Sequence, residues 1–440
     1  MADRAHNSVK ISATFALTTM AAGAAVLTLW PEHKEAVVIA QKLIQPIPVS
    51  LPLQPPAPVP LDAAKFVDFL SGLKTDLPSA GLLPATLAIA AKGLLPDPEV
   101  LELANAQPEY VKTAGEYLSL LVSDARIETG RTKLSELGKT LAAVEAAYGV
   151  DRYIVLAIWG VESNYGAGMG SRAVVRSLAT LAAFDTRRPQ FWRAELLAAL
   201  RILQAGDTPA ENLAGSWAGA MGHTQFMPTT YATHAVDFDK DGRRDIWSSI
   251  PDALASTANY LKTSGWVAGS PWGFEVRLAD GFDYALSAPG LTKTWAEWKK
   301  LGVARVEERA VPQSIGQLQL LLPAGASGPA FLAGPNFKVI LRYNNAVSYA
   351  LAVGHLGERL SGGAAFARAW PAEDKALGRL EREEMQRRLS SLGFDSGTAD
   401  GIIGADTRAA VRLFQKARGL PQDGHPDLAL LDRLRQEVKP

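Results

Sequence analysis

The stretch Ala157-Ile158-Trp159-Gly160-Val161-Glu162-Ser163-Asn164-Tyr165-Gly166 places one acidic residue directly after an apolar run. Apolar residues recur at helical spacing from about residue 148 to residue 161, and Gly166 supplies a stop signal. The pattern predicts a core helix with Glu162 in its last turn. There the helix dipole disfavours a negative charge, and burial against Trp159 and Ile158 disfavours it further. We expect a raised pKa and a general-acid role for Glu162; the alternative is a solvated glutamate that merely ends the helix.

Two later segments carry groups that suit a cleft for a sugar. Residues 215–228 read Gly-Ser-Trp-Ala-Gly-Ala-Met-Gly-His-Thr-Gln-Phe-Met-Pro, which combines small residues with aromatic, thioether and amide groups. Residues 342–345 read Arg-Tyr-Asn-Asn and add further polar and aromatic groups. Aromatic faces and a few placed polar groups are typical of ligand clefts, although Phe226 and Met227 also suit a core.

Together these three segments resemble the lytic murein transglycosylase B family, whose members cleave peptidoglycan through a lysozyme-like core. The resemblance extends from about Phe66 to Gly363. It implies that Glu162 is the catalytic acid. The residues that it places along the substrate cleft are Ser216, Gln225, Phe226, Met227, Tyr260, Tyr343 and Asn344.

Glycoside cleavage usually needs two carboxylates, yet no second one accompanies Glu162 within its motif. The resemblance implies a route that does without it, in which the sugar's N-acetyl group assists and its C6 hydroxyl attacks. Glu162 would act first as acid and then as base, and the product would be a 1,6-anhydromuramoyl end. Two alternatives stay open: a goose-type lysozyme that uses water, and a non-catalytic scaffold that binds the cell wall.

The composition excludes several other functions. The chain has 440 residues, a formal net charge of +0 and no cysteine. A neutral chain lacks the basic surface that nucleic-acid binding requires, and no cysteine is present for a thiolate metal site or a nucleophile. None of the six histidines has the spacing of a zinc hydrolase. We therefore expect that catalysis requires no cofactor.

The periodicity predicts a mainly α (α+β) fold with a small β portion between about Trp272 and Phe337, including a strand at 274–278. We place the catalytic domain at residues 62–362, a linker at 363–376 and a small three-helix domain at 377–440. In this tail Leu380, Met385, Leu389 and Leu392 mark one helix, and Asp406-Thr407 is expected to cap the next. The tail resembles the helical peptidoglycan-binding module; from periodicity alone it is a helical bundle without a ligand.

An acidic loop follows the second cleft segment. Residues 237–245 read Asp-Phe-Asp-Lys-Asp-Gly-Arg-Arg-Asp, which imitates the start of a calcium loop. Position twelve of the loop is Ser248 instead of the usual glutamate. The resemblance implies a later acidic ligand, so the candidate set is Asp237, Asp239, Asp241, Asp245 and Asp252. A structural calcium or other cation is one interpretation, and a loop held by Asp–Arg pairs is the other.

The N-terminus suggests export. Residues 11–30 form an uncharged run after Arg4 and Lys10, and residues 31–61 are rich in proline. We interpret residues 1–30 as a signal peptide or a membrane anchor and residues 31–61 as an extended linker. The expected location is the periplasm, either free or tethered to the inner membrane. Peptidoglycan strands are the expected partner of a monomeric protein.

Overall fold

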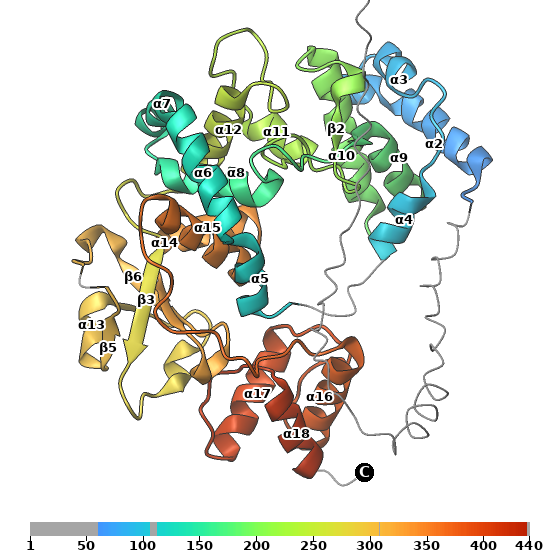
Figure 1. The fold of residues 1–440 in the computed structure, drawn as a ribbon. Helices are drawn as coiled ribbons and strands as arrows, with labels where there is room; N and C mark the ends of the chain where they lie inside the picture. The colour runs from blue at the N-terminus through green and yellow to red at the C-terminus, as the bar shows by residue number, and fades with distance from the viewer. Residues whose placement is uncertain (1–59, 106–111, 308, 438–440) are drawn as a thin grey trace, which may run out of the picture. The chain divides into compact units, whose positions relative to one another are not determined.

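The computed structural model describes residues 60–105, 112–307 and 309–437. The expected signal or anchor and most of the proline-rich linker lie outside these residues. Among the described helices, none has the length and apolar character needed to cross a membrane. The described residues form a mainly helical fold with a five-stranded antiparallel sheet and a separate two-stranded pair, which confirms the expected class (Figure 1).

The helices of the catalytic domain surround a buried central helix, α8, which contacts α15, α12, α6 and α7. From Ile154 to Gly160 every residue of α8 is buried, so it forms the centre of the main hydrophobic core. A second core joins α2, α9 and α10. The helix bounds are α2 (Ala63–Asp76), α3 (Pro84–Ala90), α4 (Pro98–Asn105), α5 (Ala114–Leu121), α6 (Asp124–Glu136), α7 (Gly138–Tyr148), α8 (Arg152–Ser163), α9 (Val174–Phe184), α10 (Pro189–Ala205), α11 (Pro228–His234), α12 (Ile250–Thr263), α13 (Trp295–Lys300), α14 (Pro335–Tyr343) and α15 (Val347–Leu360).

The start of the central helix differs from the sequence prediction. Tyr148 ends α7, and Gly149 follows with φ of 70°, a left-handed conformation that glycine adopts at little cost. Asp151 then caps α8, since its carboxylate accepts the N–H of Tyr153 at 2.7 Å. The prediction of one helix from residue 148 to residue 161 was therefore wrong, because this range contains the end of α7, a short turn and most of α8.

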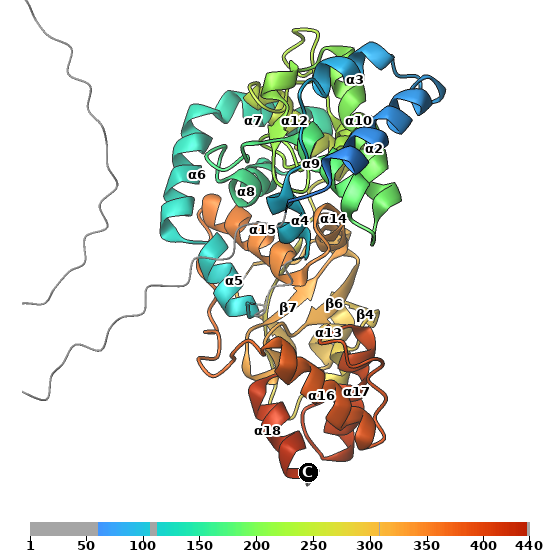
Figure 2. The same ribbon diagram turned by 90° about the vertical axis from the view of Figure 1, so that its right-hand side faces the viewer.

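The sheet lies within the predicted β region and contacts α14 (Figure 2). Its strands are all antiparallel in the order β4-β6-β7-β3-β5, and Phe274 pairs with Leu332. The predicted strand at 274–278 is confirmed as part of β3. The strand bounds are β3 (Gly273–Leu278), β4 (Thr292–Thr294), β5 (Val303–Arg305), β6 (Gln317–Leu321) and β7 (Ala330–Ala333), while β1 (Arg172–Ala173) and β2 (Ala214–Gly215) form a separate pair.

Three helices form the C-terminal domain, as expected: α16 (Arg379–Ser391), α17 (Ala405–Ala417) and α18 (Leu428–Glu437). Met385, Leu389 and Phe414 are fully buried in its core. Leu380 lies in α16 as predicted, although its side chain is 76% exposed. One detail of the prediction was wrong: the residue before α17 is Gly404, not the Asp406-Thr407 pair.

The segment expected to be a linker packs against the catalytic domain. The carboxylate of Glu275 on β3 accepts the N–H groups of Ala367 and Arg368 at 2.7 and 2.9 Å. The ring of Phe366 stacks on His355 with centroids 3.6 Å apart. Trp370 packs against the main core, where the absence of a side chain at Gly115 makes room for it. These contacts attach residues 366–370 to the domain that precedes them.

Candidate active site

The structure places Glu162 in the last turn of α8, as the sequence predicts. The helix ends at Ser163, and Asn164 forms the cap in a left-handed conformation with φ of 49°. Gly166 continues this turn with φ of 92°, so it follows the stop and does not itself make it. Glu162 thus extends from the carbonyl end of a buried helix, where the dipole opposes its ionisation.

Among the described residues, the side chain of Glu162 forms a hydrogen bond with one other side chain, that of Tyr349 of α15. The tyrosine hydroxyl donates a hydrogen bond to Glu162 Oε1 at 2.5 Å. Burial raises the pKa of Glu162 to about 7, while the bond from Tyr349 partly opposes this rise. The carboxyl group is therefore protonated at mildly acidic pH and about half protonated at pH 7, so it can act as a general acid. Tyr349 was not among the residues predicted from the sequence; the available signal was that a buried tyrosine needs a hydrogen-bond partner.

Two further tyrosines, Tyr117 and Tyr343, lie near this carboxyl group, and Tyr260 packs against Tyr343. Burial raises the pKa values of Tyr117 and Tyr343, and the charge of Glu162 raises both further. Tyr343 donates its hydroxyl hydrogen to Thr224 O at 2.6 Å, and its ring lies 4.9 Å from that of Tyr260. The tyrosine rings supply flat apolar surface with polar edges, which suits a sugar ring.

Phe226 supports these rings from the interior. It is 2% exposed, and its ring centroid lies 5.8 Å from that of Tyr260 and 5.7 Å from that of Tyr343. Tyr343 also stacks on Tyr349 at 6.5 Å. Glu162, Tyr260, Tyr343 and Phe226 are thus brought into one cluster through Tyr349.

The remaining candidates for substrate binding lie at turns. Gln225 has φ of 51° and donates its amide hydrogens to Met169 O at 3.0 Å and Gly222 O at 2.9 Å. Ser216 Oγ accepts the N–H of Ala220 at 3.0 Å, which closes a turn. Met227 precedes α11, and the exposed Asn344 ends α14. Their roles in binding substrate stay predictions.

His223 connects the segment 215–228 to the end of α8. Its Nδ1 accepts the indole N–H of Trp159 at 3.0 Å, and its carbonyl oxygen accepts the hydroxyl of Ser163 at 2.9 Å. Burial lowers the pKa of His223, and the negative charge of Asp245 offsets only part of this effect, so the ring is neutral near pH 7. No local sequence pattern predicts these contacts, because the partners are about sixty residues apart.

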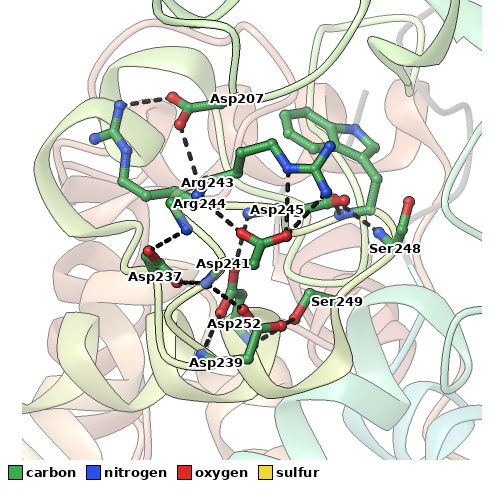
Figure 3. A network of polar contacts seen from close by, with 12 residues as sticks. Asp207, Asp237, Asp239, Asp241, Arg243, Arg244, Asp245, Ser248, Ser249 and Asp252 are labelled. Carbon is green, nitrogen blue, oxygen red and sulfur yellow. Dashed lines mark hydrogen bonds and ion pairs between the residues drawn. The ribbon is translucent and has the colours of Figure 1, made fainter.

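The acidic loop brings three of its five candidate ligands together. Asp237, Asp239 and Asp252 each place a carboxylate oxygen within 4.8 Å of the others (Figure 3). Asp252 is fully buried in the first turn of α12, and its oxygens accept the N–H groups of Phe238, Asp239 and Asp245. An all-oxygen set of this kind fits a hard cation such as calcium.

The other two candidates have partners within the loop. Asp241 pairs with Arg243 at 2.9 Å, and Asp245 accepts the N–H groups of Trp247 and Ser248 at 2.8 Å (Figure 3). Arg244 forms an ion pair with Asp207 at 2.7 Å and not with the three converging carboxylates. The converging carboxylates support the interpretation as a cation site, and the Asp–Arg pairs support the interpretation as a loop held by ion pairs.

A buried carboxyl group with a raised pKa at a helix end, with tyrosines nearby in a mainly helical fold, is the arrangement expected of an enzyme that cleaves glycans by acid catalysis. Residues 65–358 match the family described as the transglycosylase SLT domain, and the chain belongs to that family. Residues 379–434 match the family described as a peptidoglycan binding domain.

Individual relatives agree with this assignment. The chain is 33% identical over 249 residues to membrane-bound lytic murein transglycosylase B of Escherichia coli (strain K12), a match that covers 56% of this chain and 66% of the relative. The structure of SltB3 from Pseudomonas aeruginosa in complex with NAG-anhNAM-pentapeptide is 51% identical, with a TM-score of 0.81, and the match covers 84% of this chain and 99% of that one. The Escherichia coli transglycosylase Slt35 in complex with calcium is 28% identical, with a TM-score of 0.57, over 68% of this chain and 93% of that one. The chain is therefore a peptidoglycan lytic transglycosylase with a C-terminal peptidoglycan-binding domain.

Proposed function

We propose that Glu162 protonates the oxygen between N-acetylmuramic acid and N-acetylglucosamine and then, as a carboxylate, removes the proton of the C6 hydroxyl that attacks the anomeric carbon. The glycosidic bond breaks, a 1,6-anhydromuramoyl end forms, and no water is consumed. The observation that carries this proposal is the position of Glu162, which extends from the end of the buried helix α8 and has Tyr349 as its hydrogen-bond donor. Burial raises the pKa of this group to about 7, so it can hold the proton at the start and accept another at the end.

The surroundings of Glu162 favour this route over hydrolysis. A hydrolase of the goose type needs a second carboxylate to activate water. Among the described residues, burial and the bond from Tyr349 determine the pKa of Glu162, without a contribution from another carboxylate. Glu195 of α10 is buried and accepts the N–H and the hydroxyl of Thr229 at 2.9 and 2.7 Å. It stabilises the start of α11.

Digestion of purified sacculi tests the proposal. Glu162→Gln keeps the shape of the side chain but cannot deliver a proton, so we expect the rate to fall by about two to four orders of magnitude. Glu195→Gln serves as a stability control. The product of the unaltered enzyme should be lighter by one water than the product of a hydrolase. Cleavage by Glu162→Gln at the normal rate, or a hydrated product, would contradict the proposal.

The C-terminal domain is proposed to hold the enzyme on the cell wall. Deletion of residues 377–440 should leave cleavage of short soluble glycans intact and weaken action on sacculi, because the tail raises the local concentration of enzyme at the wall. Pelleting both proteins with sacculi measures the difference. Equal retention of the full-length and shortened proteins would remove this role.

The acidic loop is proposed to bind calcium through Asp237, Asp239 and Asp252, where it would stabilise structure and take no part in catalysis. The convergence of three carboxylate oxygens supports this assignment, and Slt35 has been crystallised with calcium. We further propose that the catalytic domain acts in the periplasm as a monomer, because its substrate lies outside the inner membrane. N-terminal sequencing of protein from a cell envelope fraction distinguishes a cleaved signal near Ala24 from an intact anchor.

A further inference from the structure

The last turn of α8 is held from outside the helix by His223, and the two residues that follow it contact other parts of the site. His223 contacts α8 twice, Thr224 O accepts the hydroxyl of Tyr343, and Gln225 donates to Met169 O. The three residues of this segment thus contact three different parts of the chain: the end of α8, Tyr343 of α14 and the loop at Met169. The contacts of His223 are the ones that involve the helix of the catalytic acid.

These contacts involve the residues on either side of Glu162. Trp159 lies three residues before it, nearly one helical turn away, and Ser163 follows it directly. Both are buried, at 3% and 1% exposure, and His223 is 8% exposed. Because two fixed points bracket Glu162, the helix end cannot rotate or fray without breaking a buried hydrogen bond.

The geometry also determines the tautomer of His223. An indole N–H is always a donor, so Nδ1 must be an acceptor and the ring proton must lie on Nε2. The two rings meet edge to face, with centroids 5.4 Å apart and an interplanar angle of 82°. A Cβ at Gly166 would lie 2.4 Å from the imidazole Cε1, so the turn after α8 is built closely around this ring.

We propose that His223, as the Nε2–H tautomer, is a positioning residue that fixes the last turn of α8 and thereby directs the carboxyl group of Glu162 at the glycosidic oxygen. This role rests on the proposed function of Glu162. A misdirected acid costs rate in the chemical step, because general acid catalysis depends on the alignment of the proton with its acceptor. The binding of substrate by the tyrosines is unaffected. The loss should therefore be seen in kcat, with KM unchanged.

The test uses two replacements of nearly equal shape. His223→Asn retains an acceptor for Trp159 Nε1, while His223→Leu leaves this buried donor unpaired, and both lose the ring. With a short soluble glycan as substrate, we expect kcat of His223→Leu to be about tenfold below that of His223→Asn, in line with the usual strength of one hydrogen bond. In a Trp159→Phe background the difference should vanish, because the donor is gone.

Equal kcat values for the two folded variants, or a difference that persists in the Trp159→Phe background, would overturn the proposal. If His223→Leu does not fold, Trp159→Phe alone supplies the measurement: it should reduce kcat by a similar factor at constant KM, and an unchanged kcat would overturn the proposal. Glu162→Gln separates this result from the proposed function. Normal cleavage by Glu162→Gln contradicts the role of the acid, whereas loss of cleavage there with equal Asn and Leu variants contradicts only the positioning role.

Discussion

Replacing Glu162, the proposed catalytic acid, should make the protein more stable above neutral pH. The pKa of Glu162 is raised from 4.5 to about 7 in the folded state, so folding disfavours the carboxylate. Below pH 4.5 the group is protonated in both states and contributes no difference. As pH rises from 4.5 to 7, the unfolded state ionises while the folded state keeps its proton, and the folded state loses stability relative to the unfolded one.

The shift of the Glu162 pKa sets the size of this effect. A shift of this size corresponds to at most about 3 kcal/mol, reached in full above pH 7. Glu162→Gln has no charge at any pH and keeps an oxygen that accepts the hydroxyl of Tyr349. The variant should therefore gain up to about 3 kcal/mol at pH 8.5 and almost nothing at pH 4, which is several degrees in the melting temperature.

Thermal unfolding of both proteins at pH 4, 6 and 8.5 measures this difference. Glu102→Gln, at an exposed position of α4, is the matched control. The difference in melting temperature between this variant and the unaltered protein should be the same at all three pH values. A melting temperature for Glu162→Gln that differs from the normal protein by the same amount at all three pH values would refute the reasoning. A lower stability at pH 8.5 would refute it as well.

Three further outcomes follow from the site and the loop. Tyr349→Phe removes a bond that favours the carboxylate, so the pKa of the catalytic acid rises and the fall of kcat/KM at high pH should move to higher pH; an unchanged profile would contradict this role. Gly166→Ala should lower the free energy of unfolding by about 2 kcal/mol, since its φ is 92° and an added Cβ would clash with the imidazole of His223. Gly168→Ala should cost far less, because the nearest atom to its added Cβ would be Ser163 O, 3.6 Å away. Calcium at one hundred times its Kd should stabilise the protein by about 3 kcal/mol, an effect lost in Asp237→Asn and retained in Asp241→Ala; equal responses of the two variants would contradict the assigned ligands.

The fold class and the position of the acid could be predicted because they depend on local patterns. Apolar residues at helical spacing marked α8, and β-prone runs marked the sheet. The boundary between α7 and α8 was missed, although Gly149 and Asp151 are residues that end and begin helices. The apolar spacing continued through this turn, because Val150 is buried there without being helical.

The partners of the acid could not be predicted, because they come from distant parts of the chain. Tyr349 reaches Glu162 across 187 positions in sequence. The C-terminal domain shows a related limit: Arg382 is 8% exposed because its guanidinium donates to the carbonyl groups of Gly401 and Leu377, whereas Leu380 is exposed. Hydrophobicity alone ranks these two residues in the opposite order.

The contacts of residues 366–370 bear on how such enzymes exchange their modules. Phe366 and Trp370 complete the packing of the catalytic domain, although they lie beyond residue 358, where the match to the transglycosylase family ends. A gene fusion that joins a new tail at residue 363 would remove the rings of Phe366 and Trp370 that pack against Phe331. It would also leave the carboxylate of Glu275 without its two backbone donors. A fusion after residue 371 would keep both. Successful recombination between relatives should therefore carry this short segment with the domain that precedes it.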